Sequence, residues 1–236
     1  MVRQSTLRLV EAEPSFEHDG SALSHNLNGQ KLGRKGRDTR ERILAAAMRL
    51  LAGADKEAPM SMSAVAREAS LGMTSLYNYF ADLSELLLAV LEPVMASAEG
   101  AYLAPLRQPW SDTELGQRCG EFVSAYHAYW TKHTRLLHLR NAMSDQQDQR
   151  MILARIAATQ PIIGLLVRQM GGNPDERNGA AHATATVLMI GVERAITIST
   201  DDALPVRMAM EIRHDQGHFL RPCARMMELA IRDMRG

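Results

Sequence analysis

Two helical patterns, each too short to be stable alone, stand only three residues apart within residues 61–80. Ser61 is a good N-cap for the first pattern, which places Val65 inward and runs to about residue 69. The second pattern covers about residues 73–79, with Leu76 on its apolar side. Helices of this length are marginal in water. We therefore expect longer neighbouring helices to hold both by packing.

The segments on either side carry signals of longer helices. Asp38 followed by Glu41 is a capping-box pattern, and apolar residues then recur at helical spacing to about residue 51. Asp82 followed by Glu85 repeats the pattern, and Pro93 should kink this later helix or limit its length. The sequence thus predicts three short helices packed together and a fourth helix that leads out of the group.

The composition favours an all-α fold. Apolar residues make up 46% of the chain, aromatic residues only 5%, and there are 15 methionines. Good helix formers are abundant, few windows alternate as strands do, and no Asn-Gly hairpin separates apolar runs. We find neither a signal peptide nor a stretch that is apolar and uncharged for long enough to span a bilayer, and Cys119 and Cys223 are far apart. A cytoplasmic protein without a membrane partner is the expectation.

The net charge is zero, but basic residues gather between Lys31 and Leu50. This stretch contains seven basic residues and two acidic ones, Asp38 and Glu41. This local excess is a first indication of an anionic partner. The alternative is a solvated tail followed by an exposed helix face. Residues 1–33 lack helical periodicity and are predicted to be a disordered tail.

The outer side of the second short helix is polar. If Leu76 and Phe80 face the interior, the outer surface is left to Met73, Thr74, Ser75, Tyr77 and Asn78. A helix, a three-residue turn and a second helix is the geometry that places one helix in a DNA major groove. Asn, Thr and Ser can read base edges, and Tyr hydroxyls suit phosphate oxygens. The alternative is an ordinary helical hairpin with a wet polar side.

Three segments carry a resemblance to the DNA-binding domain of the tetracycline-repressor (TetR) family. They are TRERILAAAMRLL (39–51), SMSAVAREASLGMTSLYNYF (61–80) and ADLSELLLAVL (81–91). Leu76-Tyr77-Asn78-Tyr79-Phe80 is similar to the Leu-Tyr-x-Tyr-Phe signature of the family. The resemblance covers about a fifth of the chain.

The chain departs from the family pattern at three positions. Ser70 stands where the turn usually has Gly, and Gly72 stands where a hydroxyl residue usually caps the recognition helix. Leu83 replaces the customary Lys, which removes one phosphate contact. The basic run at Arg34, Lys35 and Arg37 could compensate as a flexible arm in the minor groove.

The resemblance implies a ligand-responsive transcriptional regulator, most simply a repressor, that binds a palindromic operator as a homodimer. The implied domains are a helix-turn-helix domain at 34–92 and a helical effector-binding and dimerisation domain at 93–236. The resemblance and the exposed pattern together give the following candidate contacts to double-stranded DNA: Arg34, Lys35, Arg37, Ser61, Met62, Ser63, Gly72, Met73, Thr74, Ser75, Tyr77, Asn78 and Tyr79.

The C-terminal two-thirds reads as a bundle of amphipathic helices. Its candidate pocket for a small-molecule effector combines apolar walls with a few polar anchors, as ligand sites do. The residues are Tyr126, Trp130, His133, Arg140 and Met143. The alternative for each of them is ordinary core packing or, for His133 and Arg140, the surface.

Residues 183–198 are apolar on nearly every face, with charges only at Glu193 and Arg194. Such a helix must be buried on two sides, one of which could face a second copy of the chain. A second apolar row begins at Leu220. The candidate dimer residues are Val187, Ile190, Arg194, Met227, Ile231 and Met234. A fully buried helix in a monomer is the alternative.

Two other functions stay open from the sequence. An architectural DNA binder without an effector would bind with little sequence preference and a steep salt dependence. A helical enzyme is the second, although no phosphate loop, nucleophile elbow or catalytic carboxylate pair is visible. His214 and His218 are four apart but lack further ligands nearby, so neither a metal nor a cofactor is predicted.

Overall fold

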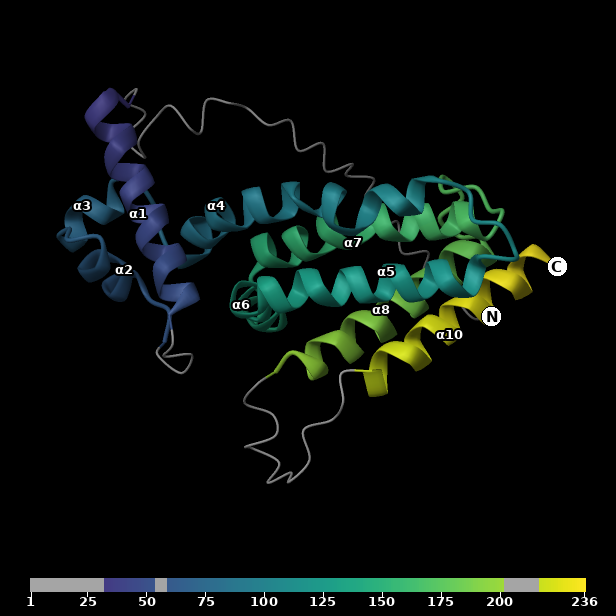
Figure 1. Ribbon diagram of the computed structural model, residues 1–236. Coiled ribbons are helices and arrows are strands. Elements are labelled where there is room, and N and C mark those ends of the chain that lie inside the picture. Colours follow the sequence, from purple (N-terminus) through teal and green to yellow (C-terminus); the bar gives the residue numbers. More distant parts are fainter. Residues whose placement is uncertain (1–31, 54–58, 202–216) are drawn as a thin grey trace, which may run out of the picture.

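The computed structural model describes residues 32–53, 59–201 and 217–236, and these residues form helices and connecting turns without a strand. The prediction of an all-α fold is confirmed. At one end of the molecule lie α1 (Arg34–Ala52), α2 (Met62–Glu68) and α3 (Met73–Tyr77), and α4 (Leu83–Ala96) leads from them into the rest (Figure 1). The tail predicted for residues 1–33 lies outside the described residues up to residue 31.

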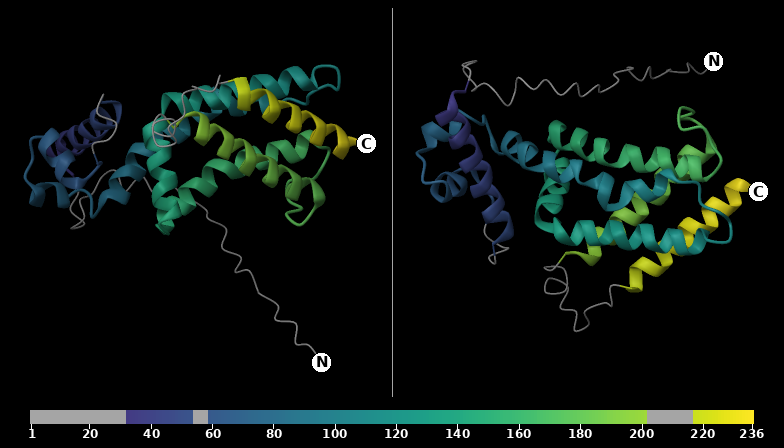
Figure 2. Two further views of the ribbon diagram at one scale, coloured as in Figure 1. Left: turned by 90° about the horizontal axis from the view of Figure 1, so that it is seen from below. Right: turned by 45° about the horizontal axis from the view of Figure 1, so that its top comes forward.

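The remaining helices form an elongated bundle (Figures 1 and 2). A π-helical turn, η1 (Glu99–Leu103), and a 3₁₀ turn, η2 (Ala104–Arg107), follow α4. The bundle helices are α5 (Leu115–Lys132), α6 (Thr134–Asp145), α7 (Gln149–Gln169), α8 (Ala180–Ser199) and α10 (Gly217–Arg235). α10 packs on both α5 and α8, while α7 packs on α6, α8 and α4.

One apolar core runs through both parts of the described chain. It extends from Ile43 in α1 through Leu87 in α4 to Phe122 in α5 and Met189 in α8. α4 contacts α1 on one side and α7 on the other, so it belongs to both parts. The domain boundary that we expected between residues 92 and 93 therefore falls inside a continuous helix.

Two of the three predicted side-chain N-caps are found. Ser61 Oγ accepts a hydrogen bond from Ala64 N over 3.2 Å, and Asp82 Oδ1 accepts one from Glu85 N over 2.9 Å. The predicted cap at Asp38 is wrong, because α1 begins four residues earlier and Gly33 is its N-cap. Buried Leu32 packs against the first turn at this point, and its main-chain oxygen accepts a hydrogen bond from Arg37 Nη1 over 3.0 Å.

The turn between α2 and α3 is a Schellman motif with a serine at the left-handed position. Leu71 N donates to Ala66 O over 2.9 Å, and Ser70 N donates to Arg67 O over 3.0 Å. Ser70 has a φ of 52°. This is the region that favours glycine, so the departure noticed in the sequence carries a backbone strain.

α4 ends at Ala96, three residues beyond Pro93. The hydroxyl of Tyr129 in α5 donates to Val94 O over 2.9 Å, and Ser97 Oγ donates to the same oxygen over 2.7 Å. Val94 O, near the end of α4, thus accepts two side-chain hydrogen bonds. The π-helical turn η1 follows after Ala98. The end of α4 is thus attached to α5.

Two helical segments, Leu83–Arg107 and Gln149–Gln169, are long and apolar enough to cross a membrane by length and composition. Both segments contain charged residues, such as Glu92 and Arg155, so neither is the apolar and uncharged stretch that the sequence was expected to lack. Core helices of proteins that never enter a membrane pass the same test, and both segments contribute buried side chains to the core.

Candidate nucleic-acid interface and internal cavity

α3 exposes the polar side that the sequence pattern predicted. Leu76 and the following Phe80 are buried. Met73, Thr74, Ser75, Tyr77 and Asn78 are exposed, and Tyr79 is half-buried. The helix is two residues shorter than predicted, since Asn78 is its C-cap. The outer face of the helix-turn-helix therefore presents hydroxyl, phenol and carboxamide groups.

The first turn of α2 contributes serines to the same part of the chain. Ser63 is exposed, and its Oγ lies 3.1 Å from Oγ of the half-buried Ser61. Met62 was a predicted DNA contact, but its side chain is buried in the core, which removes it from the candidate set. Gly72 is the N-cap of α3 with extended backbone and no side-chain cap bond.

The basic residues at the start of α1 are not an arm. Arg34, Lys35 and Arg37 form the first turn of the helix, with all three side chains exposed. Gly36 N and Arg37 N donate to Gly33 O over 3.0 and 3.1 Å, so regular helix begins here. The predicted flexible arm is wrong for these residues, which instead hold their charges on ordered backbone.

Arg40 is a cation that the sequence reading missed. Its guanidinium carbon lies 5.3 Å from the ring centre of Phe80, which follows α3. A cation over an aromatic face is attracted by the ring quadrupole. The contact joins α1 to the region that follows α3. Local spacing in the sequence could not predict it, because the partners are forty residues apart.

An internal cavity of about 70 Å³ lies among α4, η1, α5, α6 and α7. Three of the predicted pocket residues line it, namely Tyr126, Trp130 and Arg140. The other two do not: His133 lies between α5 and α6 with its ring 5.0 Å from that of Tyr129, and Met143 packs against the core. The sequence reading missed these further lining residues: Met95, Ala98, Tyr102, Leu103, Tyr129, Leu137, Ala157, Ala158 and Pro161.

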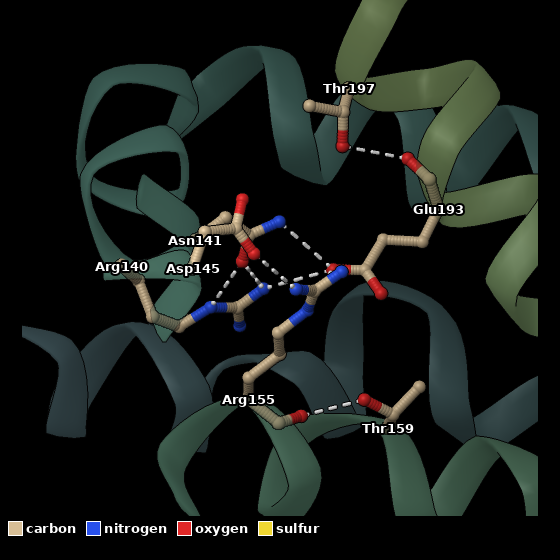
Figure 3. A network of polar contacts seen from close by, with 7 residues as sticks. All are labelled: Arg140, Asn141, Asp145, Arg155, Thr159, Glu193 and Thr197. Atoms are coloured by element: carbon tan, nitrogen blue, oxygen red, sulfur yellow. Dashed lines mark hydrogen bonds and ion pairs between the residues drawn. The ribbon is translucent and has the colours of Figure 1, made fainter. Parts of the chain in front are cut away.

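A polar network borders this cavity (Figure 3). Nε and Nη2 of Arg140 donate to Oδ1 of Asn141 over 3.0 and 2.9 Å. Glu193 Oε1 accepts from Asn141 Nδ2 over 3.1 Å and from Arg155 Nε over 3.2 Å, and lies 3.4 Å from Arg140 Nη2. In the sequence, Glu193 is a charged residue within an otherwise apolar helix. That position was the sequence feature from which a buried polar contact could have been predicted.

Three tyrosines form one wall. The ring of Tyr102 meets those of Tyr126 and Tyr129 edge-on at centroid distances of 4.9 and 5.0 Å. Burial raises the pKa of Tyr102 and Tyr126 and raises the pKa of Tyr129 to about 12. All three phenols therefore stay protonated at neutral pH and can donate hydrogen bonds.

An apolar groove of about 600 Å³ runs along α4 and α7. Leu88, Leu153 and Ala154 are among its lining residues. Met95 and Ala157 line both this groove and the internal cavity. The two hollows thus adjoin through these side chains.

α8 and α10 carry a second apolar surface. Val187 and Ile190 on α8 are 69% and 63% exposed, and Met226 and Leu229 on α10 are each 49% exposed. Arg194 is exposed and Met234 is half-buried. Met227 and Ile231, which were predicted to face a second copy, are fully buried within the subunit, so the exposed row of α10 is rotated by about one residue from the prediction.

No metal cluster is formed by the described residues, among which His218 is exposed, while His214 lies outside them. Both cysteines are free and buried. Burial raises the pKa of the Cys119 thiol to about 12, which keeps it protonated and unreactive.

Comparisons with known proteins are informative at the level of fold. No protein-family model and no curated protein matches the chain. The structure is similar to the fatty acid degradation regulator FadR from Bacillus halodurans, with a TM-score of 0.54, 12% identity, and coverage of 84% of this chain and 96% of that one. A candidate transcriptional regulator from Streptomyces coelicolor A3(2) gives a TM-score of 0.48 with 22% identity over 83% and 96% of the two chains. The first similarity shows a shared all-helical fold.

Proposed function

We propose that this chain is a sequence-specific DNA-binding transcriptional regulator of the TetR type, most simply a cytoplasmic repressor released by a small-molecule effector. The observation that carries the proposal is the α2–α3 hairpin. Its second helix buries Leu76 and leaves Thr74, Ser75, Tyr77 and Asn78 exposed. Those side chains suit base edges and phosphates, and the four-residue connection from Ala69 to Gly72 positions them together.

The basic first turn of α1 supports the same role. Arg34, Lys35 and Arg37 offer charge to DNA phosphates, which supply most of the affinity in such complexes. Arg40 beside Phe80 adds a cation near the end of α3. The charge comes from ordered helix, so it would help to fix the register of the protein on the duplex.

The exposed apolar rows of α8 and α10 support a homodimer as part of the proposal. Four large apolar side chains on adjacent helices favour burial against the same surface of a second copy. Two helices from each subunit would then form the interface. Dimerisation would present two α3 helices to half-sites one DNA turn apart.

The effector part of the proposal rests on the cavity. The cavity lies against α4, and α4 also packs on α1 of the helix-turn-helix domain. A ligand that fits the cavity in only one position of α4 would shift the separation of the recognition helices. The fold shared with a protein named as a regulator supports this reading over an enzymatic one.

Selection from a pool of duplexes with random centres tests the proposal. Purified protein should enrich an inverted repeat with half-site centres about 10–10.5 base pairs apart or a multiple of that spacing. Enrichment without a consensus, together with a steep salt dependence, would instead identify an architectural binder.

A further inference from the structure

The cavity contains a buried cation whose donors are incompletely used. Arg140 is 4% exposed, and its close acceptor is the neutral Oδ1 of Asn141. Its nearest carboxylate oxygen, on Glu193, is 3.4 Å away. Among the described residues, Nη1 of Arg140 has no hydrogen-bond acceptor, and Figure 3 shows one terminal nitrogen of this guanidinium without a dashed line.

That nitrogen is not fully enclosed. Within the described chain, Nε2 of His127 is the fully enclosed side-chain nitrogen or oxygen that lacks a partner, and Nη1 of Arg140 is not such an atom. Nη1 of Arg140 therefore keeps some accessible surface, although the residue is almost wholly buried. Arg140 is one of the residues that line the cavity. The hydroxyl of Tyr102, a residue 3% exposed, meets the same criteria and lines the same cavity.

Two guanidinium groups share one buried carboxylate beside the cavity. Glu193 is the buried carboxylate, and both Arg140 and Arg155 are directed at its Oε1. Asp145 contacts Arg155 over 3.4 Å but is mostly exposed. Arg140 shares Glu193 with Arg155 and lies 5.7 Å from the Trp130 ring centre, so its charge has partners while Nη1 has no acceptor. A buried donor without an acceptor is costly. An anionic group at Nη1 would offset that cost and would complete the unused hydrogen bonds.

Resting on the proposed function, we infer that the effector is a monocarboxylate with an apolar body. Its carboxylate accepts hydrogen bonds from Arg140 Nη1 and the Tyr102 hydroxyl. The cavity of about 70 Å³ is smaller than the roughly 150 Å³ space that holds a benzene molecule in an engineered protein core. The apolar body therefore extends past Met95 and Ala157 into the groove along α4 and α7.

Calorimetric titration of the purified full-length protein without DNA tests this inference. The probes are octanoate and phenylacetate, each compared with its neutral amide. The acids should bind at least about tenfold more tightly than the amides, because only the acids form a charge-assisted hydrogen bond between a carboxylate and the buried cation. Equal binding of acid and amide, or no binding of either acid, would overturn the inference.

Variants locate the site. Arg140→Met should reduce acid binding to the level of the amide, and Tyr102→Phe should weaken acid binding several-fold and amide binding less, because the amide oxygen accepts a weaker hydrogen bond than the carboxylate. Arg168→Met is the matched control, since it removes an exposed guanidinium of α7 that does not line the cavity. If Arg140→Met fails to fold, Tyr102→Phe decides, since its hydroxyl has no partner to lose. Unchanged acid binding in a folded Arg140→Met or in Tyr102→Phe contradicts the assignment.

The two acids distinguish the apolar bodies. Tighter octanoate binding that Ala157→Leu abolishes supports a tail in the groove, whereas tighter phenylacetate binding that survives Ala157→Leu overturns the placement of the body there. DNA retardation is measured in separate samples. Acid binding that leaves DNA affinity unchanged supports the carboxylate site and contradicts its role as the effector site.

Discussion

Asp82, the N-cap of α4, accepts a hydrogen bond through Oδ2 from Nη2 of Arg150 in the first turn of α7 over 2.8 Å. The reverse contact lies beside it, where buried Ser84 of α4 donates from Oγ to Asp148, the N-cap of α7. Each helix start is thus tied to the other. α4 and α7 also flank the cavity and the groove, so this connection fixes one end of the helix pair.

The two halves of this connection should differ in strength. Arg150→Ala should lower the free energy of unfolding by less than about 1 kcal/mol, because the ion pair with Asp82 is half exposed. Asp148→Ala should cost about 1–3 kcal/mol, since it removes the cap of α7 and leaves the buried Ser84 hydroxyl without its acceptor. Urea denaturation of both variants gives the comparison. An equal cost would show that the caps do not dominate.

Ser70→Gly should stabilise the protein. The φ of 52° at Ser70 costs a residue with a Cβ about 1–2 kcal/mol, of which a glycine recovers part after its own entropic cost. We expect a gain of up to about 1 kcal/mol in urea denaturation, with DNA affinity retained. Ser70→Ala is the control, because it keeps the Cβ. A gain in Ser70→Ala as large as in Ser70→Gly would show that strain is not the cause.

The residues of α3 should separate into two kinds of DNA contact. Tyr77→Phe should weaken binding to all duplexes alike, since a phenol at this position suits phosphate. Asn78→Ala or Thr74→Ala should relax preference at particular bases by about 1–3 kcal/mol each. Affinities for the selected operator and for random DNA decide. A uniform loss in the Asn78 and Thr74 variants would refute their assignment as base readers.

A charge in the α8–α10 surface should separate the subunits. Ile190→Glu places a carboxylate in an apolar surface that a second copy would cover, where burial without a partner is costly. Sedimentation velocity should show a monomer for this variant and a dimer for the unaltered chain. Met48→Glu, at an exposed apolar residue of α1, should leave the dimer intact. Dissociation by both variants, or by neither, contradicts this interface.

Acid should weaken the fold through His127. Burial lowers the pKa of His127 below its ordinary value of 6.5, so the unfolded chain binds the proton more readily. Stability is therefore complete above about pH 6.5 and falls as the pH drops through and below that value. Denaturation at pH 7.5 and 5.5 should show this loss, and His127→Leu should reduce it. His133, whose pKa burial also lowers, accounts for a remaining part.

Local signals were predictable from the sequence where a short stretch decides the structure. Ser61 and Asp82 cap the helices as expected, because each needs only a backbone N–H three residues ahead. Asp38 failed as a cap because Leu32, six residues before it, packs onto the chain and starts the helix early. A tertiary contact overrode the local pattern there.

Most residues of the candidate site could not be predicted from the sequence and became apparent only in the folded structure. Three of the five predicted pocket residues line the cavity, and two of them, Tyr126 and Trp130, were predictable because aromatic residues on one face of a bundle helix usually point inward. Its pairing of Arg140 with Asn141 and Glu193 brings together α6 and α8, about fifty residues apart. Helical periodicity likewise showed that α10 is amphipathic but misjudged by one residue which row faces outward.

The central claim is that two copies of α3 read a defined inverted repeat. Footprinting on the DNA that flanks the protein's own gene, with excess random competitor, tests it most directly. The account predicts two protected half-sites related by a twofold axis and spaced by about one helical turn or a multiple of it. Diffuse protection that disappears with modest salt, or no protection in any duplex that the protein selects, would contradict it.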